Sequence, residues 1–167
     1  MSDETADVAT ALLNRLEDRG ETVATAESLT GGQVCATLVD APGASAVVRG
    51  AVVAYAPEVK AQILGVDRDQ IASHGTVDAT VAREMAEGVR LRLGATWGIA
   101  TTGNAGPDPS EGKPVGMVFI AVAGPGTSAV RELSLSGDRV AIRRSTTAAA
   151  LSLLLATLEE QSAEQTG

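Results

Sequence analysis

Residues 47–55 read VVRGAVVAY, and Pro57 stands two positions further on. β-Branched and small apolar side chains dominate this run, which is the composition of a strand. A proline shortly after a strand suits the first turn of a helix, because the N–H group that proline lacks has no helical partner there. The stretch therefore predicts a strand that leads directly into a helix.

Outward from this strand, predicted helices and strands alternate in both directions. Residues 5–19 carry a stripe of Val and Leu at helical spacing, and Gly20 is placed to end that helix. Asp78 is placed to cap another helix, which runs through Leu93. Together, the alternating elements are helices at 5–19, 30–40, 57–64, 67–73 and 78–93 and strands at 22–25 and 96–101.

The C-terminal part of the chain follows a different pattern. Residues 115–123 and 129–136 predict two strands, and the GPGTS turn between them makes these strands a hairpin. Asp138 begins a last helix, and the tail after Glu160 is expected to fray. A hairpin that follows interleaved helices and strands predicts a mixed sheet with helices on both faces.

Length and composition agree with one compact core. A chain of 167 residues suits a single domain and can bury enough surface to be stable. Hydrophobic residues make up 44% of the chain but aromatic residues only 2%, so Ala, Val, Leu and Ile must fill the core. We expect an α/β fold: a single three-layer α/β/α domain with a mixed sheet of about five or six strands, over residues 1–167 with a core at about 5–160.

Charge and residue usage exclude several classes of function. The net charge of −8 disfavours direct binding of nucleic acid. No apolar run approaches the roughly 20 residues of a membrane helix, and the acidic N-terminus is unlike a basic signal peptide, so we expect a cytoplasmic protein. Cys35 and His74 are the sole cysteine and histidine, too few for a zinc site of ordinary composition, and neither a metal nor another cofactor is expected.

The surface charge permits two explanations. The chain has 21 acidic residues, and only Lys60 and Lys113 are lysines. An acidic, lysine-poor surface is typical of proteins from a salt-rich cytoplasm, which suggests a halophile. A GC-rich genome that favours Arg, Ala, Val and Gly predicts the same composition.

Three polar segments follow predicted strands, at residues 26–32, 55–60 and 101–107. In an interleaved α/β sheet, ligands bind where strands end and helices begin. If the strands are parallel neighbours, the three segments meet at one edge of the sheet. This edge is the expected site.

Ser28 and Lys60 are the candidate catalytic pair. Ser28 precedes a helix opened by Gly31 and Gly32, where free backbone N–H groups can bind an oxyanion. Lys60 lies near a strand end and becomes a base if burial lowers its pKa from ~10.4 to about 7–8. Ser28 or Thr30 can equally be no more than a helix cap, and Lys60 can be a solvated lysine paired with an acidic neighbour.

Further candidates surround this pair. Ser45 follows a Pro-Gly turn and can relay a proton between Ser28 and Lys60, or be an ordinary loop serine. The loop that begins at Thr102 and Gly103 can wrap a phosphate or ribose with backbone amides, or form only a tight turn. Arg139 can hold a phosphate through two hydrogen bonds, or be solvated like the arginines that follow it. His74 is expected to satisfy helix carbonyls rather than to catalyse.

Several motifs in a fixed order resemble those of the CinA C-terminal domain family. They are TAESLTGG, YAPEVK, LGV followed by HGTV, TTGNAGPDP, KPVG and SGDRVAIRR, and the resemblance runs from about Leu13 to Leu158. Stand-alone members of that family are nicotinamide-nucleotide amidohydrolases, also called NMN deamidases. The resemblance implies a metal-independent serine hydrolase that converts nicotinamide mononucleotide to nicotinic acid mononucleotide and ammonia.

The family motifs place roles on individual residues. Ser28 matches the serine of the ESxTGG motif, and Lys60 and Tyr55 match the lysine and tyrosine of the Y-x-N-x-x-K motif. Ser45 matches the second serine of a GSS segment, so either serine can be the nucleophile; only Ser28 adjoins a glycine-opened helix.

The remaining family positions are assigned to substrate binding. Thr102 and Gly103 match the start of the Gly-x-Ala-Gly-Pro turn, and Arg139 matches the arginine of GDR; the helix-opening residues Thr30, Gly31 and Gly32 complete this group.

The sequence departs from the family pattern in three places. Pro57 stands at the usual Asn, Ala44 at the first serine of GSS, and Asp78 at a usual Ser. Pro57 removes an amide near Lys60, which keeps open an alternative: a nucleotide-binding or competence- and damage-associated domain with little or no catalysis. The expected partners are a small nucleotide substrate and further copies of the chain in a homo-oligomer.

Overall fold

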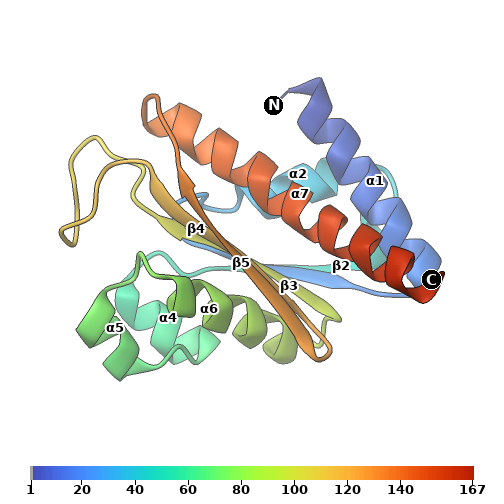
Figure 1. Cartoon of the computed structure of the whole chain (residues 1–167), viewed down its shortest axis with the longest axis horizontal. Helices are drawn as coiled ribbons and strands as arrows, with labels where there is room; N and C mark the ends of the chain where they lie inside the picture. The colour runs from blue at the N-terminus through green and yellow to red at the C-terminus, as the bar shows by residue number, and fades with distance from the viewer. Residues whose placement is uncertain (1) are drawn as a thin grey trace.

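The computed structural model describes residues 2–167, which form a five-stranded sheet between two layers of helices (Figure 1). The strands are β1 (Val23–Glu27), β2 (Val48–Val53), β3 (Trp97–Gly103), β4 (Met117–Gly124) and β5 (Thr127–Ser134). The helices are α1 (Asp3–Arg19), α2 (Gln33–Asp40), α3 (Ala44–Val47), α4 (Pro57–Leu64), α5 (Arg68–His74), α6 (Ala79–Arg92) and α7 (Arg139–Gln165). The predicted α/β class is confirmed.

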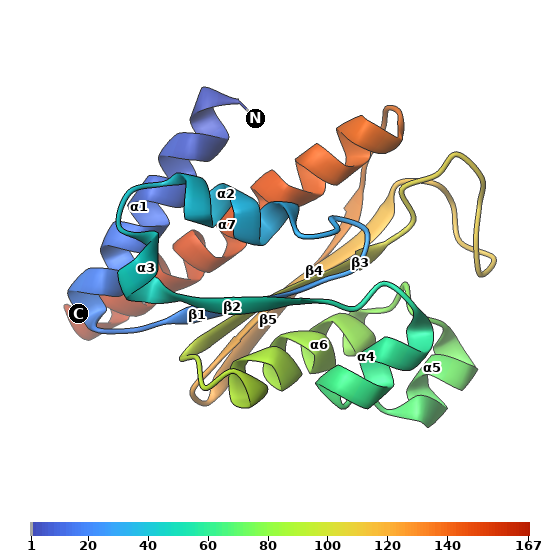
Figure 2. The same ribbon diagram turned by 180° about the vertical axis from the view of Figure 1, so that it is seen from behind.

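The sheet is mixed, in the strand order β2-β1-β3-β4-β5. β1 lies parallel to both β2 and β3, whereas β4 is antiparallel to β3 and to β5. Helices α1, α2 and α7 cover one face, and α4, α5 and α6 cover the other (Figure 2). The parallel strands β2, β1 and β3 therefore end at one edge of the sheet, as the sequence predicts.

Small side chains set how closely the layers approach. A Cβ atom at Gly88 would lie 2.0 Å from the carbonyl oxygen of Leu64, so α6 and α4 touch through their backbones. A Cβ atom at Gly98 would lie 2.0 Å from the carbonyl oxygen of Ala86, so α6 also rests directly on β3. Trp97, the one tryptophan, is buried on the opposite face of the sheet. The aliphatic core thus gains contact area through close packing.

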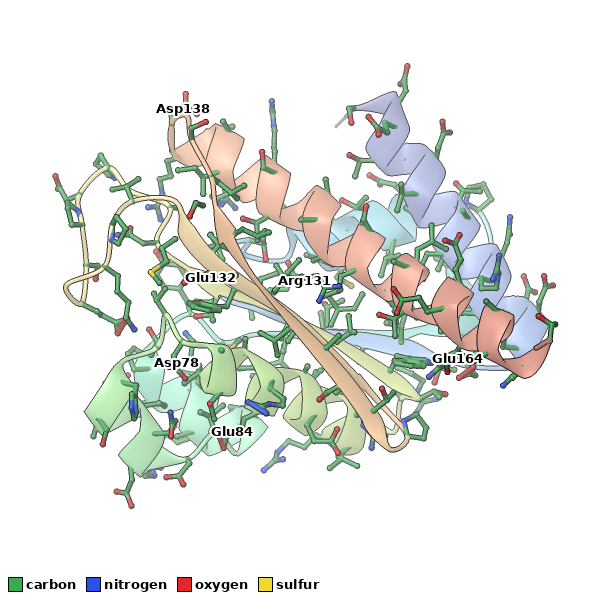
Figure 3. The ribbon with its side chains drawn as sticks, in the orientation of Figure 1. Asp78, Glu84, Arg131, Glu132, Asp138 and Glu164 are labelled. Atoms are coloured by element: carbon green, nitrogen blue, oxygen red, sulfur yellow. The ribbon has the colours of Figure 1, made fainter. Side chains whose placement is uncertain are left out.

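Helix ends follow the signals in the sequence. Gly20 ends α1 in the left-handed conformation at φ 66°, and its N–H bonds back to the helix. The side chains of Asp78 and Asp138 accept N–H groups at the starts of α6 and α7, where Figure 3 labels both residues. Pro57 occupies the first turn of α4. These local signals placed the starts of α4, α6 and α7, but the helix expected from Thr30 begins only at Gln33, because residues 30–32 form a turn.

The structure corrects the prediction for the C-terminal tail. Helix α7 does not fray after Glu160 but continues to Gln165. Leu158 is buried in the core cluster that also holds the leucines of α1, and Arg19 of α1 donates a hydrogen bond of 2.8 Å to the side chain of Gln161. Packing on α1 therefore extends the helix beyond the point where apolar periodicity stops. No helix within residues 2–167 is long and apolar enough to cross a membrane.

Candidate active site

A cavity of about 590 Å³ opens where the parallel strands end. Ser28 directly follows β1, Gly103 ends β3, and Tyr55 and Pro57 follow β2; all four line the cavity. Arg139, at the start of α7, lines it from the other side. The three polar segments therefore meet at one edge of the sheet, as expected from the sequence.

Ser28 and Lys60 lie in direct contact beneath this cavity. Lys60 is 1% exposed, and its Nζ donates to Ser28 Oγ at 3.0 Å. The same Nζ donates to the carbonyl oxygens of Ala54 at 2.8 Å and Tyr55 at 3.0 Å. Lys60 is therefore a buried amine with three fixed partners, and the solvated-lysine alternative is excluded.

Burial changes the acidity of this lysine. Desolvation lowers the pKa of Lys60 from its ordinary 10.5 to about 8, although the negative charges of Glu111 and Glu58 act in the opposite direction. Consequently about one tenth of the amine is unprotonated at pH 7 and about half at pH 8. A neutral amine keeps two N–H bonds to the two carbonyls, which leaves its lone pair for the hydroxyl proton of Ser28.

Glu27, immediately before Ser28, organises the surrounding turn. It is fully buried, and its carboxylate accepts the N–H groups of Gly32, Val34 and Cys35 at 2.9–3.1 Å. It also accepts the hydroxyls of Thr25 and Thr30. A carboxylate at the N-terminus of α2 satisfies donors that the helix leaves free and suits the helix dipole.

This carboxylate overturns the predicted role of the helix-opening residues. Gly32 gives its N–H to Glu27, and Gly31 gives its N–H to the carbonyl of Ser28 at 3.1 Å. Thr30 is fully buried, with its hydroxyl bonded to Glu27 and Thr101. None of these groups is available to a substrate, because intramolecular acceptors already hold them.

The other predicted binding residues divide into two groups. Gly103 lines the cavity, and Arg139 donates to Tyr55 Oη at 3.0 Å and to the carbonyl of Gly106. Thr102 is 1% exposed and turns its hydroxyl to the carbonyl of Thr76 at 2.7 Å, so it braces the cavity wall instead of facing it. The expectation that Thr102 grips the substrate is wrong for this reason.

Ser45 lies at the far end of β2. It is exposed in the four-residue helix α3, which the sequence pattern does not predict, and it lines a separate hollow of about 480 Å³ with Cys35 and Arg49. The six residues of β2, roughly 20 Å of extended chain, separate it from Lys60. Within one chain, Ser45 therefore cannot relay a proton between Ser28 and Lys60.

The loop between β3 and β4 closes one side of the cavity. Glu111 has φ 57° and accepts the N–H groups of Thr76 and Val77 at 2.8–3.1 Å. Burial raises the pKa of Glu111, but these hydrogen bonds outweigh burial and the net pKa is lowered. Lys113 donates to the carbonyls of His74 and Val77. Acidic and basic side chains of the loop thus bind the backbone before α6.

The sequence pattern does not assign two of the residues that position the site, Glu27 and Arg143. Glu27 carried a usable signal, because a carboxylate between a strand and a helix start is suited to the helix dipole. Arg143 carried none. It was considered solvated, yet its guanidinium donates to the carbonyls of Leu29 at 2.8 Å and Thr30 at 3.2 Å, from more than a hundred residues away.

The described residues offer no metal centre. Within residues 2–167 no three His, Cys, Asp or Glu side chains are grouped so as to hold an ion. His74 lies exposed at the end of α5, with Nδ1 3.1 Å from the side chain of Gln70. The available chemistry is that of a serine beside a buried amine.

Known proteins resemble this chain in both sequence and fold. The family model described as the CinA C-terminal domain matches residues 5–158. A CinA-like protein of Frankia casuarinae is 51% identical over 143 residues, which cover 86% of this chain and 33% of that protein. A CinA-like protein of Gloeobacter violaceus is 49% identical over 155 residues, or 91% of this chain and 36% of that protein.

Solved structures agree over nearly the whole chain. The competence/damage inducible protein CihA from Agrobacterium tumefaciens is 33% identical with a TM-score of 0.91, and the match covers 95% of this chain and 98% of that one. A CinA superfamily protein from Enterobacter cloacae is 29% identical with a TM-score of 0.90, covering 92% of each chain.

The chain spans about a third of the length of the curated relatives it matches. The family model, by contrast, covers nearly all of this chain, and the solved structures share its fold from end to end. The motif order in the sequence, the sheet order and these matches agree. The chain belongs to the CinA C-terminal domain family.

Proposed function

We propose that this domain hydrolyses the carboxamide of nicotinamide mononucleotide, yielding nicotinic acid mononucleotide and ammonia. The observation that supports this most is the contact between Ser28 and Lys60, in which a buried amine with a pKa of about 8 lies 3.0 Å from a serine hydroxyl at a cavity. A serine activated by an adjacent base is the arrangement that acyl transfer requires. The resemblance to NMN deamidases supplies the substrate.

The first half of the reaction forms an acyl-enzyme. Neutral Lys60 takes the hydroxyl proton of Ser28 as Oγ bonds to the carboxamide carbon, and the carbonyl electron pair moves onto oxygen. The C–N bond then breaks, and the Lys60 ammonium gives its proton to the departing nitrogen, which leaves as ammonia. The carbonyls of Ala54 and Tyr55 hold the amine in place throughout both transfers.

The second half returns the enzyme to its starting state. Water attacks the ester carbon while Lys60 accepts a water proton, and the ester C–O bond breaks to release the carboxylic acid. Ser28 Oγ recovers its proton from Lys60. One amide and one water thus give one acid and one ammonia, and Ser28 and Lys60 return to their starting protonation states.

The cavity has room for a nucleotide, and among the described residues Arg139 is the basic side chain in its lining, beside the acidic Asp108 and Glu111. Its volume of about 590 Å³ lies within the ordinary range for small-molecule sites. Leu29, Pro57 and Val77 supply apolar walls for a pyridine ring. Arg139, held by Tyr55 and Gly106, offers a preoriented guanidinium for the phosphate.

A second candidate is a nucleotide-binding domain without catalysis, and the observation behind it is Pro57 in the cavity wall. The family motif has Asn at this position, so an amide group is lost close to Lys60. Ammonia release from nicotinamide mononucleotide separates the two candidates. Turnover that requires Ser28 supports the hydrolase, whereas tight binding of the nucleotide with no ammonia supports the binding domain.

The rate should depend on pH through Lys60. Because the base must be neutral and its pKa is about 8, kcat/KM is expected to rise about tenfold per pH unit below pH 8 and to level off above it. Initial rates of ammonia release between pH 6 and 10 test this expectation. A rate that is flat across pH 7 to 9 would show that Lys60 is not the titrating base.

Activity should not need a metal ion. Since the proposed mechanism uses a serine and an amine, prolonged dialysis against a chelator is expected to leave kcat unchanged. Ammonia release before and after dialysis is the measurement, with metal content checked in parallel. Loss of activity that a divalent ion restores would contradict the mechanism.

A further inference from the structure

Two backbone N–H groups beside Ser28 are without a protein acceptor. Within residues 2–167, the N–H groups of Leu29 and Thr30 make no hydrogen bond to another protein group. Both residues are buried, at 4% and 0% exposure. Because a buried unpaired N–H costs free energy, such groups are rare and often functional.

The orientation of these two N–H groups follows from their peptide planes. In a trans peptide the C=O and the N–H point in opposite directions. The plane carrying the Leu29 N–H is fixed through the Ser28 carbonyl, which accepts the N–H of Gly31 at 3.1 Å. The plane carrying the Thr30 N–H is fixed through the Leu29 carbonyl, which accepts Nε of Arg143 at 2.8 Å. Each N–H group therefore points away from the donor that its own peptide carbonyl accepts, which is the Gly31 N–H for Leu29 and Arg143 Nε for Thr30.

Arg143 supports both planes. Its second contact, from Nη2 to the Thr30 carbonyl at 3.2 Å, fixes the peptide whose other end is the Gly31 N–H. That N–H holds the Ser28 carbonyl, so one guanidinium determines the whole turn. Gly31 itself has φ 59°, a left-handed conformation that favours glycine, and a Cβ atom there would lie 3.2 Å from Nη2 of Arg143.

We propose that the N–H group of Leu29, which lines the cavity together with Ser28, is an oxyanion donor and that Arg143 is the positioning residue that orients it, whereas the fully buried Thr30 lies outside the cavity lining. This inference rests on the proposed function, in which Ser28 forms an acyl-enzyme. The N–H of the residue after a nucleophile is a recurrent oxyanion donor in hydrolases. The Leu29 N–H takes the role that the sequence suggested for Gly31 and Gly32, whose N–H groups are already bonded.

The test compares Arg143→Met with Arg144→Met, an exposed arginine at the next position of α7. Arg143→Met is expected to lower kcat by about 10²-fold, the loss typical of a misplaced oxyanion donor, with KM changed less than about threefold. Arg144→Met should match the wild type. Arg143→Lys, which can reach one carbonyl, should recover part of kcat, and the pH midpoint near 8 should stay in place because Lys60 is untouched.

A purely structural role for Arg143 predicts a different pattern. It would lower the thermal midpoint and the active fraction while kcat per folded active site stayed constant, and this result would overturn the proposal. A fall in kcat that comes with a comparable rise in KM would also overturn the proposal. If Arg143→Met does not fold, Arg143→Lys carries the test, with an intermediate fall in kcat at constant KM expected.

A small aryl ester such as p-nitrophenyl acetate separates this inference from the choice of substrate. Acylation of Ser28 by the ester needs the oxyanion donor but no nucleotide recognition. A burst rate that falls in Arg143→Met supports the inference even if nicotinamide mononucleotide is not hydrolysed. An equal burst rate in both proteins overturns the inference alone, and a wild type without any burst overturns both.

Discussion

Ser28→Ala is expected to lower kcat for nicotinamide mononucleotide by about 10⁴-fold or more, because no acyl-enzyme can form without the hydroxyl. Lys60→Met is expected to lower kcat by about 10²–10⁴-fold, the range that a positioned general base contributes. Both changes act on one 3.0 Å contact, so the double variant should be little worse than Ser28→Ala alone. Ammonia release under saturating nucleotide measures all three.

Folding must be checked separately for these variants. Lys60→Met removes a buried amine, which relieves desolvation, but leaves the carbonyls of Ala54 and Tyr55 without their donor. These effects oppose one another, and the thermal midpoint should change by only a few degrees. The proposed mechanism is contradicted if Lys60→Met folds normally and keeps a kcat within about tenfold of the wild type.

Glu27→Ala should produce the largest loss of stability of any single change at the site. The carboxylate is fully buried and accepts three N–H groups and two hydroxyls, all of which lose their acceptor. Each buried donor left unpaired costs about 1–3 kcal/mol. Five such donors give a loss of about 5–15 kcal/mol, and because a chain of this size loses about 2–4 °C of thermal midpoint per kcal/mol, the midpoint should fall by at least about 10 °C.

Two further variants give that experiment its controls. Glu160→Ala removes an exposed carboxylate from α7 and should leave the midpoint unchanged. Glu27→Gln keeps the side-chain volume but turns an NH₂ group toward N–H donors, so its midpoint should lie between the wild type and Glu27→Ala. A midpoint for Glu27→Ala equal to that of Glu160→Ala would mean that the carboxylate does not hold the start of α2.

The family and much of the fold were predictable from local patterns in the sequence. Helical and strand periodicity reflect backbone preference and burial over short windows, which is why the late hairpin and the helix starts at Pro57, Asp78 and Asp138 were placed correctly. The extension of α7 to Gln165 depends on α1 and was missed. Ser28 and Lys60 were nominated because both stand near strand ends within specific motifs.

The partners of each polar group were decided only by the tertiary structure. Sequence spacing does not state that Lys60 Nζ meets Ser28 Oγ, that Thr102 turns to the Thr76 carbonyl, or that Ser45 lies at the opposite end of β2. Glycines at a helix start suggested free N–H groups, but the buried Glu27 already holds one of them. A hydrogen bond needs its two atoms within about 3 Å and well aligned, and only the packed layers bring groups from distant segments to that accuracy.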